Sequence, residues 1–150
     1  QKKGGEYQLP DALRRLTEKG TPFVPGTVSD WLDCGNKKVT VDTNHSVLNF
    51  EHEKGNHLVS KEAELIDSIV IEPCFIGKGA KIIRSVIGPH VSIGDHTQVA
   101  DSRISNSIIQ QNTHVSNLIL QDSMIGSHVK AKGAVKDLSI GDYTEMGDAN

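Results

Sequence analysis

A six-residue spacing of apolar residues, punctuated by glycine, runs through the second half of the sequence. The dipeptide Ile-Gly begins at residues 76, 87, 93, 125 and 140. Further apolar residues extend this spacing in groups of three, and a new group starts every 15 to 17 residues. The groups are Val70, Ile76 and Ile82; Ile87, Ile93 and Val99; Ile104, Ile109 and Val115; Leu120, Ile125 and Ala131; and Val135, Ile140 and Met146. A period of this kind indicates a stacked repeat architecture.

The spacing matches the hexapeptide repeat of a left-handed parallel β-helix. In this fold three short strands form a triangular coil, each strand turns a bulky apolar residue inward, and corners favour residues that tolerate left-handed backbone angles. Coils stack roughly 4.8 Å apart, so equivalent residues form columns. We predict about five coils from Val70 to Met146, with Ile93 stacked between Ile76 and Ile109. A β-sandwich is the alternative, but its strands recur every ~8–12 residues.

The composition changes partway along the chain. Isoleucine is absent from residues 1–64 and occurs fourteen times in residues 66–140. A polar, charged stretch, residues 51–64, separates the two pieces and suits a linker. We therefore predict a mainly β protein in which an α/β remnant (1–50) and the linker precede the β-helix (65–147).

The first piece contains patterns for two helices. Residues 10–20 carry an early proline and a terminal glycine, as a helix of that length prefers. A second helix is predicted from an Asn36 cap to about Phe50, and short strands at Phe23-Val24 and at Val28. Fifty residues of this kind bury too little apolar surface for a complete domain. The residues expected on one face of the second helix are Val39, Thr43, Val47 and Phe50.

Composition and charge exclude several classes of protein. The formal net charge of −3 gives no electrostatic footprint for nucleic acid. No apolar run approaches the ~20 residues of a membrane span. Two cysteines are too few for a disulfide framework, which favours a reducing, cytoplasmic location. The chain starts without methionine, and we expect it to be a piece of a longer protein.

Two motifs in the first piece resemble one enzyme family. Residues 4–13 read GGEYQLPDAL and resemble the segment GE-x-Q-L-T-D-A, with Pro10 in place of threonine. Residues 31–35 read WLDCG and resemble W-x-D-x-G. Both segments occur in this order in glucose-1-phosphate nucleotidyltransferases that use UTP or dTTP. The chain thus resembles the C-terminal part of a sugar-1-phosphate nucleotidyltransferase, over residues 4–50 and, by domain order, over the repeats.

The resemblance implies a reaction and a set of site residues. A nucleoside triphosphate and a sugar 1-phosphate yield a nucleotide sugar and pyrophosphate, with Mg²⁺ offsetting the phosphate charge. By the family pattern Asp33 helps hold the metal, Glu6 contacts the sugar, and Gly5 and Trp31 line the substrate site. Without the resemblance, Asp33 is interpreted as a turn residue, and Glu6 as an acidic residue that favours the dipole in the first turn of a helix.

Other parts of the family pattern are absent from this sequence. The Gly-rich loop with its arginine, the other metal-binding aspartate and the phosphate-binding lysine have no counterpart. The Gly77-Lys78-Gly79 run lies inside a predicted coil and lacks the strand–turn–helix context of a phosphate loop. We therefore expect this chain alone to be inactive.

Two other functions stay open at this point. One alternative is that the coils serve as an oligomerisation or regulatory module, and self-association is expected from their exposed ends and flat faces. A hexapeptide-repeat acyltransferase is the other alternative. The coil histidines next to inward positions are predicted to lie on a solvated outer face, and Cys74 in the core. These histidines are His90, His96, His114 and His128.

Overall fold

The computed structural model describes residues 2–3, 6–28 and 31–134, and the chain divides into two units, 1–31 and 32–150. In the first unit, β1 (Lys2–Lys3) pairs antiparallel with β2 (Glu6–Tyr7), and α1 (Leu9–Glu18) follows. The predicted first helix is confirmed, and α1 buries none of its side chains.

The strands predicted at Phe23-Val24 and Val28 are wrong. This segment has no regular structure, and all three side chains are exposed. Pro22 and Pro25 lack the N–H group that a sheet ladder requires, which explains why the apolar residues pair with nothing.

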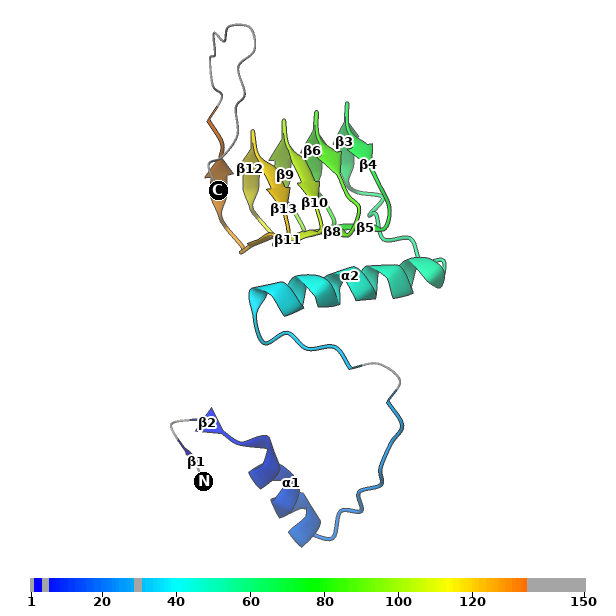
Figure 1. The fold of residues 1–150 in the computed structure, drawn as a ribbon, viewed down its shortest axis with the longest axis vertical. Helices are drawn as coiled ribbons and strands as arrows, with labels where there is room; N and C mark the ends of the chain where they lie inside the picture. Colours follow the sequence, from blue (N-terminus) through cyan, green and yellow to red (C-terminus); the bar gives the residue numbers. More distant parts are fainter. Residues whose placement is uncertain (1, 4–5, 29–30, 135–150) are drawn as a thin grey trace, which may run out of the picture. The chain divides into compact units, whose positions relative to one another are not determined.

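The second unit contains a parallel β-helix of three sheets (Figure 1). One sheet contains β3 (Glu64–Ile66), β6 (Lys81–Ile83), β9 (Gln98–Ala100), β12 (His114–Ser116) and β15 (Lys130–Lys132). The next contains β4 (Ile69–Val70), β7 (Val86–Ile87), β10 (Arg103–Ser105) and β13 (Ile119–Gln121). The third contains β5 (Cys74–Ile76), β8 (Val91–Ile93), β11 (Ser107–Ile109) and β14 (Met124–Ile125).

The predicted columns of apolar side chains form the core of this β-helix. Ile93 pairs in register with Ile76 on one side and Ile109 on the other, which confirms the predicted column. All three side chains are at most 1% exposed. Cys74 is also buried, as predicted. Four complete coils lie between β3 and β14, and the predicted coil from Val135 to Met146 lies outside the described residues.

The corners use the left-handed backbone conformation that the repeat predicted. Ten described non-glycine residues have positive φ, and six of them are asparagine or aspartate, the types that tolerate this region. The ten are Asp67, Arg84, His90, His96, Asp101, Asn106, Asn112, Asn117, Asp122 and His128.

Helix α2 (Lys37–Glu53) packs against β8 and β11, alongside the stacked coils (Figure 1). The predicted second helix is confirmed, but the face that contains Val39, Thr43, Val47 and Phe50 is not the one that carries its buried residues. Val41 and Leu48 are the buried residues, whereas Val47 and Phe50 are exposed. Val39 and Val41 lie two positions apart, which rotates them by about 200° around the helix, so the predicted face lies on the other side.

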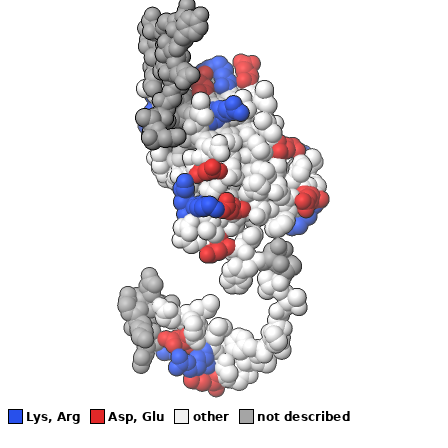
Figure 2. Space-filling model, in the orientation of Figure 1, with Lys and Arg blue, Asp and Glu red and all other residues white. Residues whose placement is uncertain are grey.

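The visible surface carries charges of both signs. Acidic and basic side chains are interspersed over the side of the β-helix shown in Figure 2. The described residues also form ion pairs, such as Arg84–Asp101 at 2.7 Å. Within the described ranges, no helix is both long enough and apolar enough to cross a membrane.

Candidate functional site

The candidate site is the Asp33 loop, residues 33–36, which leads directly into α2. Asn36 caps the helix, because its side-chain oxygen accepts a hydrogen bond from the Val39 N–H at 3.1 Å. The Asp33 Oδ1 atom accepts the Cys34 N–H at 2.7 Å. A Cβ atom on residue 35 would lie 3.3 Å from Asp33 Oδ2, so glycine there keeps the carboxylate uncrowded. The Asp33 side chain is exposed, and the hydrogen bond from the Cys34 N–H orients one of its two carboxylate oxygens.

Two threonines of α2 hold the backbone of this loop. The Thr43 hydroxyl donates to the Asp33 carbonyl oxygen at 2.6 Å. The Thr40 hydroxyl lies 2.8 Å from the Asn36 carbonyl and 3.3 Å from the Cys34 carbonyl. The position of Asp33 therefore depends on the position of α2.

The Asn44 side chain connects helix α2 to the β-helix through hydrogen bonds. The Ser92 hydroxyl of β8 donates to Asn44 Oδ1 at 2.6 Å. The Asn44 amide nitrogen lies 3.4 Å from the His90 carbonyl oxygen. Both contacts are partly buried, and together they use the amide oxygen and the amide nitrogen of one side chain. The register of α2 on the coils is therefore defined by polar contacts as well as by Val41 and Leu48.

A stacked histidine pair lies beside Asn44. The rings of His45 and His90 have centroids 3.5 Å apart and are inclined by 12°. His90 Nε2 contacts Asn49 Oδ1 at 2.9 Å. Burial lowers the pKa of His90, and the charge of His45 lowers it further. The stacked arrangement of the two rings is therefore more stable when His90 is neutral than when it is protonated.

The predicted solvated position is wrong for His90. It is half-buried under α2, whereas His96, His114 and His128 are exposed as predicted. The repeat places all four side chains outward, but it does not reveal which face α2 covers.

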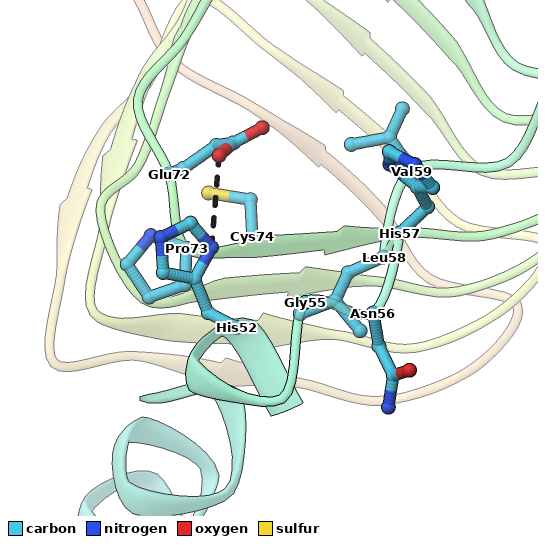
Figure 3. A pocket seen from close by; sticks show the side chains of 9 residues that line it. All are labelled: His52, Gly55, Asn56, His57, Leu58, Val59, Glu72, Pro73 and Cys74. Carbon is cyan, nitrogen blue, oxygen red and sulfur yellow. Dashed lines mark ion pairs between the residues drawn. The ribbon is translucent and has the colours of Figure 1, made fainter. Parts of the chain in front are cut away.

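At its C-terminal end, α2 borders a cavity of about 220 Å³ (Figure 3). His52 Nδ1 lies 3.6 Å from Glu72 Oε2 across one wall. The Cys74 thiol donates to a backbone carbonyl at 3.0 Å, and burial raises its pKa to about 11. This cavity therefore offers a contact between a histidine and a carboxylate, together with a protonated thiol rather than a thiolate nucleophile.

Asp33 is the carboxylate that the sequence resemblance assigns to the predicted metal. Mg²⁺ is usually held by one or two protein carboxylates together with substrate phosphates. The exposed Asp33 fits the role of one oxygen ligand. Residues 2–3, 6–28 and 31–134 contain no group of three His, Cys, Asp or Glu that could hold a metal ion.

The other predicted site residues are placed only in part. Trp31 is 85% exposed and belongs to the first unit, whereas Asp33 belongs to the second. Gly5 and the side chain of Glu6 lie outside the described residues. The grouping of these four residues stays a prediction. The contacts of Thr43 and Asn44 were not predicted from the sequence. Polar residues spaced along a helix that precedes a repeat are nevertheless a pattern that indicates docking of the helix through hydrogen bonds.

Comparison with known proteins reveals relatives of one kind. No family model matches the sequence. The chain is 27% identical over 144 residues to a glucose-1-phosphate thymidylyltransferase of Streptomyces griseus, covering 87% of the chain and 41% of that protein. The same enzyme of Streptomyces antibioticus is 26% identical over 140 residues, covering 84% and 39%. A probable mannose-1-phosphate guanyltransferase of Schizosaccharomyces pombe is 42% identical over 72 residues, covering 46% and 16%.

The chain spans about two fifths of the length of the two thymidylyltransferases. The similarity extends over most of this chain and agrees with the motifs and with the β-helix. These matches confirm that the chain resembles sugar-1-phosphate nucleotidyltransferases, and the structure confirms the predicted β-helix.

Proposed function

We propose that this chain is the C-terminal part of an enzyme that makes a nucleotide sugar, dTDP- or UDP-glucose, from a nucleoside triphosphate and a sugar 1-phosphate. The observation that carries the proposal is the Asp33 loop. An exposed carboxylate lies in a W-x-D-x-G motif, has one fixed hydrogen bond and is anchored by Thr43. The similarity to two glucose-1-phosphate thymidylyltransferases supports the same reaction class.

The residues of this chain would bind and orient the substrates. Asp33 would supply one oxygen ligand for Mg²⁺, and the Glu6 carboxylate would accept hydrogen bonds from sugar hydroxyls. Gly5 and Trp31 would line the substrate site. When bound, Mg²⁺ would supply positive charge that offsets the charge of the phosphates.

The proposal includes inactivity of this chain by itself. Its sequence has no counterpart of the Gly-rich loop, the second metal-binding aspartate or the phosphate-binding lysine that the family pattern requires. The rest of the site would come from residues of the full-length protein. The two free cysteines support a cytoplasmic location, because thiols persist in reducing compartments.

The direct experiment is a substrate screen with the full-length protein. Pyrophosphate release is measured with glucose 1-phosphate and each of dTTP, UTP, GTP and ATP, with Mg²⁺ present and after its removal by chelation. We expect release with dTTP or UTP that is lost on chelation, and none from this chain alone. Absence of release with glucose 1-phosphate and either dTTP or UTP would refute the proposal.

A second role, self-association through the β-helix, is favoured by one face. Ile69, Val86, Arg103 and Ile119 pair in register along the outer surface of the β4, β7, β10 and β13 sheet. Ile69 is 61% exposed and Ile119 is 84% exposed. This column contains three apolar side chains and one arginine, and its exposed isoleucines suit contact with a second copy of the chain.

A further inference from the structure

Neighbouring residues of α2 make contacts in different directions. Thr43 donates to the carbonyl of Asp33, and Asn44 is held by Ser92 of the β-helix. Successive helical residues are rotated by about 100°, so one turn of helix can contact both the loop and the coils. This turn of α2 therefore connects the Asp33 carbonyl to a fixed strand through two short hydrogen bonds.

We propose that Thr43 is a positioning residue for Asp33, and that the β-helix fixes the Asp33 loop through Ser92, Asn44 and Thr43. This inference rests on the proposed function of Asp33 as a metal ligand. In this inference the β-helix contributes to metal binding as well as to self-association, because contacts from the coils define the position of the Asp33 carboxylate.

The geometry explains why the loop needs such an anchor. The loop is exposed, and the hydrogen bond from the Cys34 N–H orients the Asp33 carboxylate only relative to its own backbone. The Thr43 hydroxyl fixes that backbone relative to α2. Site groups must be held within about 0.5 Å of their productive position, and a displacement near 1 Å can cost about 10²-fold in rate.

Residues of the same helix provide matched variants. Thr43→Val keeps the shape of the side chain and removes the hydroxyl, whereas Thr43→Ser keeps the hydroxyl. Ser46 is the control, because its hydroxyl bonds to Asp42 within the helix at 3.2 Å and does not contact the loop. Ser92→Ala breaks the same connection at the β-helix.

The experiment uses the full-length protein and two readouts. Mn²⁺ binding is measured by electron paramagnetic resonance in the presence of nucleotide, and the Mg²⁺ dependence of pyrophosphate release is measured in parallel. For Thr43→Val we expect the metal concentration at half-saturation to rise about three- to tenfold, as the loss of one hydrogen bond predicts. Ser92→Ala should shift it in the same direction, and Thr43→Ser and Ser46→Ala should behave as wild type.

The outcomes separate this inference from the proposed function. If Asp33→Asn impairs metal binding while folded Thr43→Val and Ser92→Ala both bind Mn²⁺ as wild type does, Thr43 does not position Asp33, and the proposed function survives. If Asp33→Asn itself binds metal and reacts as wild type does, the role of Asp33 fails. Thermal melts confirm folding, and if Thr43→Val does not fold, Ser92→Ala decides.

Discussion

Removing the side chain of Ile93 should destabilise the β-helix more than any surface change of equal size. Ile93 is 0% exposed and lies in a column between Ile76 and Ile109. Ile→Ala in such a site costs about 2–5 kcal/mol in free energy of unfolding, since both transfer energy and a cavity contribute. At about 3 kcal/mol and about 2–4 °C per kcal/mol for a chain of this length, Ile93→Ala should lower Tm by roughly 6–12 °C.

The matched control is Ile119→Ala, because Ile119 is 84% exposed on the outer face, and both variants are compared at a protein concentration low enough for the chain to be monomeric. Its cost should stay within about 0.5 kcal/mol. Thermal unfolding of the chain, followed by circular dichroism, compares the two variants. Ile93→Asp should prevent folding, since the core column gives the charge no partner. Equal Tm values for Ile93→Ala and Ile119→Ala would refute the register of the coils.

Three further predictions follow from the described side chains. The pKa of His90 is lowered, so its contribution to stability is fully present above about pH 6.5, the ordinary histidine pKa, and is lost as the pH falls below that value. Urea unfolding of wild type, His90→Gln and the control His96→Gln from pH 8 to 5 should therefore show a smaller loss of unfolding free energy for His90→Gln alone. Cys34 is exposed, whereas Cys74 is buried and has a pKa raised to about 11. A thiol reagent at pH 8 should therefore label Cys34 quickly and Cys74 only on unfolding, and rapid labelling of the folded Cys34→Ser variant would contradict this. Light scattering should show an oligomer that Ile119→Lys weakens, and a wild-type monomer at high concentration would exclude self-association.

The repeat made the β-helix predictable, because its period specifies both the inward residues and the corners. Ile93 and its column could be placed from spacing alone, since coils of nearly constant length bring equivalent positions into register. The asparagine and aspartate corners follow from the backbone conformation that each corner requires.

The docked face of α2 was not predictable in the same way. Hydrophobic periodicity favoured the face that contains Val47, but the helix also docks through Asn44 and His45, whose polar groups find partners on the coils. Such contacts depend on residues more than forty positions away, which a local pattern does not contain. The bond between Thr43 and Asp33 joins residues only 10 positions apart, but it depends on how an irregular loop folds back onto the helix, which the hydrophobic pattern does not specify.

The role of Asp33 is the central claim, and Asp33→Asn in the full-length protein tests it most directly. The amide keeps the shape and the turn but removes the anionic oxygen that Mg²⁺ requires, whereas Asp42→Asn on α2 changes an exposed ion pair with Lys38 and serves as the control. Pyrophosphate release is measured over a Mg²⁺ titration. We predict that Asp33→Asn loses most of the activity and needs more Mg²⁺, while Asp42→Asn behaves as wild type. Wild-type activity of Asp33→Asn with an unchanged Mg²⁺ requirement would contradict the account.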